Sequence, residues 1–293
     1  MNMGKQLQLQ QNKCTLLTQR REPQEEEELW TNTDRVLYGP VASRRLGESI
    51  GINLFPDRKI CSYNCVYCDV GLSKYNNKKY VEFEKISQLF EDQIIPIKEK
   101  FQNDLIKIDY FTFCGNGEDL DHPDFEKIYY FIRDILNELF PEIPTAILTN
   151  GANLANPKNI KIINEMDVNF IKLDAGDEKT FLRINRPQNH NIWELLINNL
   201  KYIKNLRLET AIVDSEKYSN LASLHSNYID LIHIYEKLEN LKEIYLHNID
   251  YPTPDKNIRL IGIEELEELA DFIAKKVKIP VYVLCSRVNF RER

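Results

Sequence analysis

The sequence predicts an α/β fold in which parallel strands alternate with helices and curl into an open or partial barrel. From Tyr38 onward, short apolar runs alternate with longer amphipathic segments, the pattern of strands joined by helical crossovers. Continuous apolar runs such as Ile108–Phe113 suit strands that are covered on both faces. Right-handed crossovers between parallel strands then leave the helices on the outside of the sheet.

The predicted elements follow one another as strand and helix along the chain. Short apolar runs are predicted as strands at Ser49–Leu54, Ile108–Phe113, Thr145–Leu148, Phe170–Leu173, Leu208–Val213, Glu243–Leu246 and Val281–Leu284. Longer segments with apolar residues at helical spacing are predicted as helices at Ile86–Phe101, Phe125–Leu139, Trp193–Ile203 and Ile263–Val277. The crossovers after the first strand are enough to curl the sheet into a partial barrel.

The chain is predicted to form one domain after a polar extension. Residues 1–33 combine Gln, Lys, Arg and Glu with little apolar periodicity, and we expect a flexible or loosely docked segment. Residues 34–293 contain no Pro/Gly-rich linker, and a chain of 293 residues with 43% hydrophobic content can bury one large core. Cys14 lies in the extension without ligand neighbours, so we expect it to take no part in a metal site.

The composition indicates in which compartment the protein acts and which classes of partner it can bind. The net charge of −7 and the pI near 5.4 argue against broad electrostatic attraction to nucleic acid, while they leave room for a local basic groove. No apolar run is long enough to span a bilayer, so we expect no membrane span. A reducing compartment keeps cysteine thiols unpaired, and we expect a cytoplasmic protein.

Three cysteines crowd into the segment Cys61-Ser-Tyr-Asn-Cys65-Val-Tyr-Cys68, after the first predicted strand. Thiolates at this spacing fit a 4Fe–4S cluster in which three irons take protein ligands and the fourth iron stays free to bind a reactive partner. In parallel sheets the working residues sit at the carboxyl ends of strands, and this loop falls at such an end.

A structural zinc site is the alternative interpretation of these cysteines. Such sites close four ligands around the metal, commonly as paired cysteines or cysteines with nearby histidines. The nearest histidine is His122, and neither Cys114 nor Cys285 has a paired cysteine. Crowded thiols with an open fourth position therefore favour the iron–sulfur cluster over zinc, and over buried thiols gathered by chance.

The Cys-x3-Cys-x2-Cys loop resembles the cluster loop of the radical S-adenosylmethionine (SAM) superfamily, in which the free iron binds SAM. The resemblance implies a partial (βα)6 TIM-like barrel with one [4Fe–4S] cluster and SAM as cofactors. It also implies that one electron cleaves SAM to methionine and a 5′-deoxyadenosyl radical, which abstracts hydrogen from a substrate. The substrate is unidentified, and a flavodoxin or ferredoxin would supply the electron. Tyr67 fits the aromatic that packs beside the cluster in this superfamily.

The second predicted strand ends in a segment that resembles the superfamily's Gly-Gly-Glu, which binds the amino group of SAM. This segment is Cys114-Gly115-Asn116-Gly117-Glu118. It departs from the superfamily pattern where Asn116 separates the glycines and where Asp119 replaces a proline. The alternative is an ordinary strand-to-helix turn in which Asp119 or Asp121 caps the next helix.

The third and fourth strands end in further blocks that resemble superfamily segments. Thr149 and Asn150 stand in a Thr-Asn-Gly block that resembles the third strand end, although Asn-Gly alone is a turn signal. Lys172 and Asp174 stand in Lys-Leu-Asp-Ala, which resembles one subgroup and implies a place at the cofactor. Lys172 would hold the SAM carboxylate or the substrate, or else form a solvated pair with Asp174.

The segment Tyr38–Gly47 resembles the leader of a family of small radical SAM proteins, described by distant similarity to tRNA wyosine synthases and nitrogenase-cofactor maturation enzymes. Its Arg44 and Arg45 would bind a phosphate or carboxylate of the substrate, or brace the barrel mouth through carboxylate pairs. Arg183 and Arg186, in an Arg-Ile-Asn-Arg-Pro block that also resembles the subgroup, are further candidates for substrate contacts.

Two other functions stay open from the sequence. An RNA-modifying radical SAM enzyme that rebuilds a tRNA base would need an arginine-lined mouth, and the acidic balance and the lack of an RNA-binding module weigh against it. An iron–sulfur carrier or redox sensor would use the open iron for cluster transfer, without turnover. The glycine-rich turn and the Thr-Asn-Gly block argue against a carrier, because a carrier needs no SAM pocket.

Overall fold

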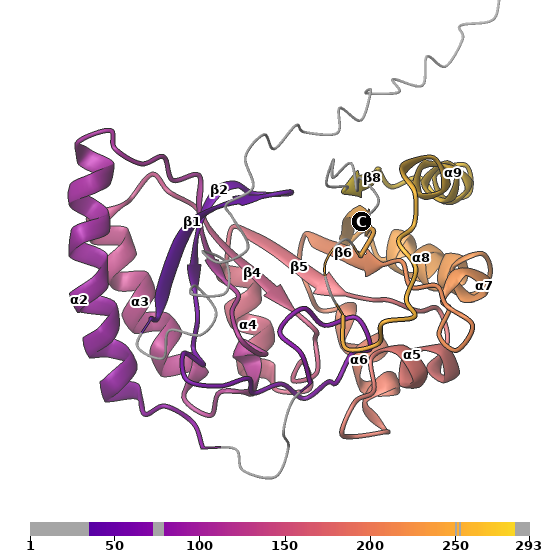
Figure 1. Ribbon diagram of the computed structural model, residues 1–293, viewed down its shortest axis with the longest axis horizontal. Coiled ribbons are helices and arrows are strands. Elements are labelled where there is room, and N and C mark those ends of the chain that lie inside the picture. Colours follow the sequence, from indigo (N-terminus) through magenta and orange to yellow (C-terminus); the bar gives the residue numbers. More distant parts are fainter. Residues whose placement is uncertain (1–34, 73–78, 250, 252, 285–293) are drawn as a thin grey trace, which may run out of the picture.

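The computed structural model describes residues 35–72, 79–249, 251 and 253–284. The predicted extension over residues 1–33, including Cys14, and the isolated Cys285 fall outside this description. The described residues form one eight-stranded sheet whose strands lie side by side in sequence order, from β1 to β8 (Figure 1). The sheet curls into a partial barrel with helices around it, so the predicted fold class is confirmed.

Parallel pairing dominates the sheet. β1 runs antiparallel to β2, and each later neighbouring pair up to β8 is parallel. The strands are β1 Leu37–Ser43, β2 Gly47–Ile52, β3 Tyr110–Phe113, β4 Thr145–Thr149, β5 Val168–Lys172, β6 Leu206–Ala211, β7 Leu241–His247 and β8 Val281–Leu284. Every predicted strand has its counterpart in β2 to β8. β1 is additional, and Gly39 and Pro40 interrupt the pattern that would have indicated it.

Helices lie around the outside of the curled sheet, from α2 and α3 at the β1 end to α8 and α9 at the β8 end (Figure 1). They are α2 Phe83–Gln102, the 3-10 turn η1 Asp119–Asp121, α3 Phe125–Leu139, α4 Pro157–Glu165, α5 Glu178–Ile184, α6 Ile192–Leu200, α7 Leu221–Leu224, α8 Asn227–Lys237 and α9 Ile263–Ala274. The predicted helices correspond to α2, α3, α6 and α9. Helices α5 and α7 are too short to show a period, but the prediction missed α4 and α8 although their buried residues have helical spacing.

Tyr38 connects the β1–β2 hairpin to the rest of the sheet through a packing contact and a hydrogen bond. Its ring lies so close to Gly51 of β2 that an added Cβ would come within 2.0 Å of it, and only glycine permits this contact. Its hydroxyl donates a hydrogen bond of 2.8 Å to the carbonyl of Cys114, directly after β3. The leader segment Tyr38–Gly47 therefore builds the first strand and anchors it beside the carboxyl end of β3.

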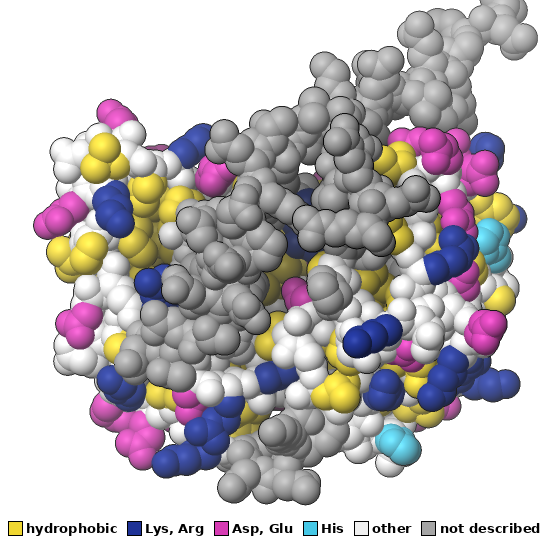
Figure 2. Space-filling model, viewed as in Figure 1, with side chains coloured by type: hydrophobic (Ala, Val, Ile, Leu, Met, Phe, Trp, Pro, Cys, Tyr) yellow, Lys and Arg dark blue, Asp and Glu magenta, His cyan; other side chains and the backbone are white. Residues whose placement is uncertain are grey.

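The described surface carries charged side chains of both signs (Figure 2). No helix in the described ranges is both long and apolar enough to cross a bilayer. The face in Figure 2 carries both Lys or Arg and Asp or Glu side chains along its rim. Both signs of charge are thus present on this face, in keeping with the modest net charge of −7.

Candidate cluster and cofactor site

The cysteine loop, Cys61–Cys68, follows β2 and is held by its backbone. Its three cysteines are free thiols and half-buried. Ile60 forms an isolated β-bridge with Gly117, and Tyr63 forms one with Pro187. A Cβ added to Gly117 would lie 1.9 Å from the carbonyl oxygen of Ile60, so glycine is required for this approach. The loop is therefore fixed against the turn after β3 and against the segment after α5.

Each cysteine sulfur accepts a hydrogen bond from a side-chain nitrogen of another residue. The contacts are Asn150 Nδ2 to Cys61 Sγ at 3.4 Å, Asn185 Nδ2 to Cys65 Sγ at 3.5 Å and Lys59 Nζ to Cys68 Sγ at 2.8 Å. Burial raises the pKa of the Cys65 thiol to about 12 and raises the pKa of Cys61 well above its usual value. Binding of a cationic metal centre displaces such protons, because the thiolate is the metal ligand.

Glu118 lies at the end of β3 and is held by the end of β4. The hydroxyl of Thr149 donates to one carboxylate oxygen, and the backbone amide of Asn150 donates to the other at 2.7 Å. The residue is 3% exposed. Burial, followed by the charge of Asp121, raises its pKa to about 8. A buried carboxyl in this state gains from a cation placed beside it, because the cation favours the ionised form.

The residues before Glu118 pack their turn against the segment that follows β2. The side-chain oxygen of Asn53 accepts the backbone amide of Asn116 at 3.0 Å, and the Asn116 side chain donates to the Phe55 carbonyl at 3.2 Å. A Cβ on Gly115 would lie 2.3 Å from the side chain of Asn53. Gly115 and Asn116 thus bring the β3 turn close to the chain that leads into the cysteine loop.

The alternative in which Asp119 or Asp121 caps the next helix is wrong, because both lie within η1, whose N-cap residue is Glu118. Asp124 occupies the N-cap position of α3. Asp121 instead accepts a hydrogen bond from the side chain of Asn153. Asp119 is buried, and burial together with the neighbouring Glu118 raises its pKa well above the usual value. The turn therefore gathers acidic side chains in the interior and does not use them to start α3.

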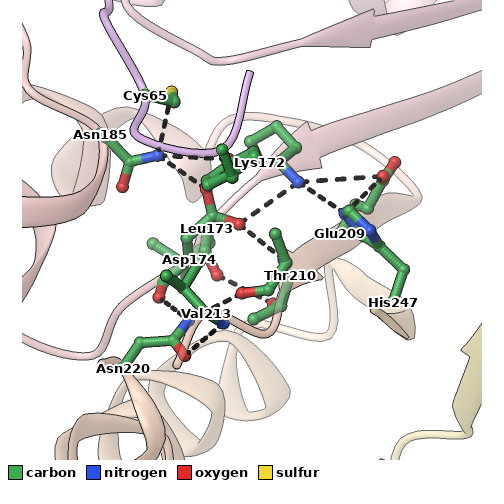
Figure 3. A network of polar contacts seen from close by, with 12 residues as sticks. Cys65, Lys172, Leu173, Asp174, Asn185, Glu209, Thr210, Val213, Asn220 and His247 are labelled. Carbon is green, nitrogen blue, oxygen red and sulfur yellow. Dashed lines mark hydrogen bonds and ion pairs between the residues drawn. The ribbon is translucent and has the colours of Figure 1, made fainter. Parts of the chain in front are cut away.

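Lys172, the last residue of β5, lies in a polar network with residues of β6 and β7 (Figure 3). Its ammonium is 2.9 Å from His247 Nε2, 3.3 Å from Asp174 Oδ1 and 3.9 Å from Glu209 Oε1. The pair with Asp174 forms, but it is buried and not solvated, because the Asp174 side chain is 0% exposed. The ammonium also lies 5.2 Å from the centre of the Tyr67 ring, beside the last cysteine of the loop.

Asp174 joins this network to the cysteine loop (Figure 3). One of its oxygens accepts the hydroxyl of Tyr67 and the side-chain amide of Asn185, the latter at 2.6 Å. Its other oxygen accepts the backbone amide of Ala211 at 2.7 Å. Because Asn185 also donates to Cys65, polar contacts run without a break from the cysteine loop to the lysine of β5.

Arg44 and Arg45 lie on the turn before β2, whereas the cysteine loop follows the other end of that strand. The turn itself therefore lies at the amino end of β2. The Arg45 side chain nevertheless forms an ion pair with Glu209 of β6, and its guanidinium lies 5.6 Å from the Phe170 ring centre. Burial opposes ionisation of Glu209, but the charges of Arg45 and Lys172 lower its pKa to about 2. Arg45 is thus engaged by a carboxylate of this chain.

Arg183 and Arg186 belong to the end of α5 and the segment after it. Arg183 donates a hydrogen bond to the carbonyl of Lys217, and the Arg186 guanidinium lies 5.6 Å from the ring centre of Tyr218. The carbonyl of Arg186 accepts the backbone amide of Asn64, within the cysteine loop, at 3.1 Å. These two arginines therefore border the cysteine loop, while Arg45 reaches the network from the opposite end of β2.

The profile of the Radical SAM superfamily matches residues 58–215, more than half of the chain, and this range holds the cysteine loop, Glu118 and Asp174. The chain belongs to the radical SAM superfamily. Among its relatives, a UPF0026 protein of Methanocaldococcus jannaschii is 32% identical over 247 residues, which cover 80% of this chain and 70% of the relative. A UPF0026 protein of Helicobacter pylori is 29% identical over 251 residues, which cover 84% and 76%.

Solved structures of radical SAM proteins have a similar fold. A radical SAM methyltransferase from Sphaerobacter thermophilus aligns with a TM-score of 0.59 at 14% identity, over 82% of this chain and 67% of that one. TYW1 with a lysine–pyruvate adduct bound aligns with a TM-score of 0.52 at 17% identity, over 78% and 73%. At these identities the likeness concerns the fold of a radical SAM barrel and carries no substrate with it.

Membership of the radical SAM superfamily implies a 4Fe–4S cluster and SAM. Within the described ranges, no three Cys, His, Asp or Glu side chains gather as a site for a single metal ion. A 4Fe–4S cluster binds each thiolate through a different iron, so its ligands surround the cluster and do not meet at one ion. Three free thiols on one fixed loop, each with its own N–H donor, fit such a cluster.

The sequence prediction missed several residues of this radical SAM site. Glu209 had a readable signal, because it is a lone acid inside an apolar strand. Asn185 stands between the two arginines that were singled out, and Lys59 is two positions before the first cysteine. His247 ends β7, and no local pattern gives it a function. Their association depends on which strands become neighbours, and spacing along the chain does not show that.

Proposed function

We propose that this radical SAM protein is an enzyme whose cysteine loop holds one [4Fe–4S] cluster. When the cluster and SAM are bound, one electron would cleave SAM to methionine and a 5′-deoxyadenosyl radical that abstracts hydrogen from the substrate. The cluster ligands would be Cys61, Cys65 and Cys68. The observation that supports this most is the bridge between Ile60 and Gly117, which packs the cysteine loop directly against the turn that carries Glu118.

Glu118 would accept the ammonium of SAM in this proposal. Its carboxyl is buried with a pKa of about 8, so an ammonium beside it would favour the ionised form and form a charge-assisted hydrogen bond. Thr149 and Asn150 would orient the carboxylate through the hydrogen bonds that they already donate to it. The turn Gly115–Gly117, which includes Asn116, would let backbone approach the cofactor without side-chain bulk at its glycines.

Tyr67, Lys172 and Asp174 would complete the cofactor site. The Lys172 side chain is 20% exposed, and its ammonium would bind a carboxylate of SAM or an anionic group of the substrate. Asp174 would hold both the Tyr67 hydroxyl and the Lys172 ammonium in position. These residues would also exclude water from the reacting groups, because Tyr67 and Asp174 are buried.

Four arginines remain the proposed substrate contacts: Arg44, Arg45, Arg183 and Arg186. Arg183 and Arg186 border the cysteine loop and suit an anionic group held near the cofactor. Arg45 would have to give up its ion pair with Glu209 before it could bind a substrate, so it is the weaker candidate for a substrate contact. The free thiols of the loop suit a reducing cytoplasm, where a flavodoxin or ferredoxin would supply the electron.

The test is anaerobic reconstitution of the cluster, reduction with dithionite and addition of SAM alone, with 5′-deoxyadenosine and methionine measured by mass spectrometry. We expect both products from the wild-type protein and neither from a Cys65→Ala variant, which should lose the cluster. A Cys14→Ala variant is the matched control and should retain both products, because Cys14 lies far from the loop in the sequence and has no ligand neighbours. A reducible cluster that binds no SAM and yields no product would contradict the proposal and favour a carrier or sensor.

A further inference from the structure

The three sulfurs of the cysteine loop each receive a side-chain N–H donor, and the three donors come from separate parts of the chain. Cys61 Sγ also accepts the backbone amide of Tyr63 at 3.4 Å, within the loop. Asn150 follows β4, Asn185 is the C-cap residue of α5, and Lys59 precedes the loop. Each donor contacts a different cysteine. A thiolate bound to iron keeps lone pairs that accept hydrogen bonds, so these contacts are compatible with a bound cluster. Lys59, Asn150 and Asn185 are thus hydrogen-bond donors to the ligand sulfurs.

The orientation of both asparagine amides is fixed by their other partners. The Asn150 side-chain oxygen accepts the backbone amide of Ala152 at 2.8 Å, which turns Nδ2 toward Cys61. Asn185 Nδ2 faces the Asp174 carboxylate at 2.6 Å, and a flipped amide would place two oxygens against each other there. Asn185 Oδ1 is buried and has no hydrogen-bond partner among the described residues. The contacts of Asn185 Nδ2 therefore determine the orientation of this side chain.

Lys59 adds a full charge to this arrangement. Its ammonium lies 2.8 Å from Cys68 Sγ and also donates to the carbonyl of Gly71, so two contacts hold it beside the loop's last cysteine. The contact fixes a cation next to one ligand sulfur, whereas the two asparagines contribute only amide dipoles. Of the three hydrogen-bond donors, Lys59 should therefore have the largest electrostatic effect on its ligand sulfur.

Hydrogen bonds to ligand sulfurs change the redox properties of iron–sulfur centres. Reduction adds one electron, so the reduced cluster carries one more negative charge than the oxidised cluster. Donors that point at the sulfurs stabilise the more negative state and raise the reduction potential. A cluster that must accept an electron from a small carrier protein depends on this value, because it sets the reduced fraction at a given solution potential.

We propose that Lys59, Asn150 and Asn185 are positioning residues that raise the reduction potential of the cluster through their hydrogen bonds to the three cysteine sulfurs. This inference rests on the proposed function, because it needs the cluster to be bound. The residues touch the ligand sulfurs and not the reacting atoms, so their effect appears in the ease of reduction. The resemblance to superfamily segments gave no role to Lys59 or Asn185.

The experiment is a redox titration of the reconstituted cluster without SAM, followed by electron paramagnetic resonance of the reduced state. The variants are Lys59→Met, which keeps the apolar stem, Lys59→Arg, which keeps the charge and donors, and Asn185→Leu. Asn199→Leu is the matched control, since Asn199 is half-buried on α6 and its side-chain amide donates to the Leu195 carbonyl within that helix. Iron content is measured first for every protein.

We expect Lys59→Met to lower the ratio of reduced to oxidised cluster tenfold at the wild-type midpoint potential, a shift of about 59 mV for one electron. Asn185→Leu should lower that ratio by a smaller factor, and Lys59→Arg and Asn199→Leu should keep the wild-type midpoint. If Asn185→Leu assembles no cluster, the Lys59 variants decide the result alone.

Equal midpoints for the wild type and Lys59→Met, each with full iron content, would overturn the inference and leave the proposed function intact. A wild-type protein that assembles no 4Fe–4S cluster would overturn the proposed function, and the inference would fall with it. The presence of a wild-type cluster thus separates the two failures.

Discussion

Asn185 places one side-chain nitrogen between Cys65 Sγ and Asp174 Oδ2, at 3.5 Å and 2.6 Å. This single amide joins the cysteine loop to the carboxylate that follows β5. Asp174 also accepts the hydroxyl of Tyr67 and the backbone amide of Ala211. The loop is therefore held in place by the sheet through a buried carboxylate as well as by its backbone bridges.

Asp174→Asn should lower the free energy of unfolding of the protein without its cluster by about 3 to 5 kcal/mol, because it leaves a buried ion pair without its acid. The new amide would also present a donor where the carboxylate accepts hydrogen bonds on both oxygens. Urea unfolding measures this change. Asp230→Asn, at an exposed position of α8, should change the value by less than about 0.5 kcal/mol. Equal effects of the two substitutions would mean that the Asp174 contacts carry no stability.

The pair between Arg45 and Glu209 should show strong energetic coupling. Arg45→Met leaves Glu209 with Lys172 and His247, whereas Glu209→Gln leaves the cations without their acid. In a double-mutant cycle we expect the double variant to be more stable than the sum of the single losses predicts, by about 1 to 3 kcal/mol. The measurement is urea unfolding of the four proteins. Strictly additive losses would show that this pair does not act as a unit.

Glu118 should make the stability of the cluster-free protein depend on pH. Its pKa is raised from 4.5 to about 8, so the folded chain holds this proton more tightly than the unfolded chain does. The stabilising effect is therefore complete below pH 4.5 and is lost as the pH rises through about 8. Glu118→Gln, which mimics the protonated carboxyl, lacks this dependence.

Urea unfolding of the wild type and of Glu118→Gln across this pH range tests the sign. The variant should gain stability relative to the wild type as the pH rises, because only the wild type pays for ionising a buried carboxyl. Cys61 and Cys65 keep their protons across this pH range in both proteins, because burial raises the pKa of each thiol. A difference that stays constant with pH would show that Glu118 ionises normally in the fold.

How far the sequence predicts this site depends on the range of the contacts. The cysteine loop, Glu118 and Thr149 are local signals, because each belongs to the segment that follows a predicted strand, and the parallel sheet brings such segments together. The partners of Lys172 are different. His247 lies 75 positions away, and the contact exists only because β5, β6 and β7 are consecutive neighbours in the sheet. Arg45 stands two positions before β2, so the sequence alone places its backbone at the amino end of that strand, whereas its ion pair with Glu209 of β6 depends on how the sheet curls.

Gly117→Ala should prevent cluster assembly while the sheet still folds. The added Cβ would lie 1.9 Å from the Ile60 carbonyl oxygen and 2.7 Å from the Phe55 ring, and the Ile60 backbone cannot swing aside as the end of a flexible side chain would. The cysteine loop must then move away from the turn after β3. Iron content after reconstitution and far-ultraviolet circular dichroism measure the two effects separately.

The matched control for Gly117→Ala is Gly262→Ala. Gly262 precedes α9, and its added Cβ would have no neighbour closer than 3.8 Å, so this substitution should leave the iron content unchanged. Full iron loading of Gly117→Ala would show that the loop can bind its cluster without the close bridge to Ile60. In that case the packing of the loop on the Glu118 turn would not be what places the cluster ligands.

Glu118→Gln should weaken SAM binding to the reconstituted protein by about 10-fold to 100-fold, because a charge-assisted hydrogen bond to an ammonium contributes about 1.5 to 3 kcal/mol. The variant keeps the shape of the side chain and can still accept a hydrogen bond from Thr149, so the cluster should assemble normally. Isothermal titration with SAM under anaerobic conditions gives the dissociation constant, and iron content confirms that the cluster is present. Glu126→Gln, a surface carboxylate of α3 that pairs with Lys158, should bind SAM like the wild type. If Glu118→Gln also binds SAM with wild-type affinity, the ammonium contact belongs to another residue, and the resemblance of the β3 turn to the Gly-Gly-Glu segment does not extend to its role.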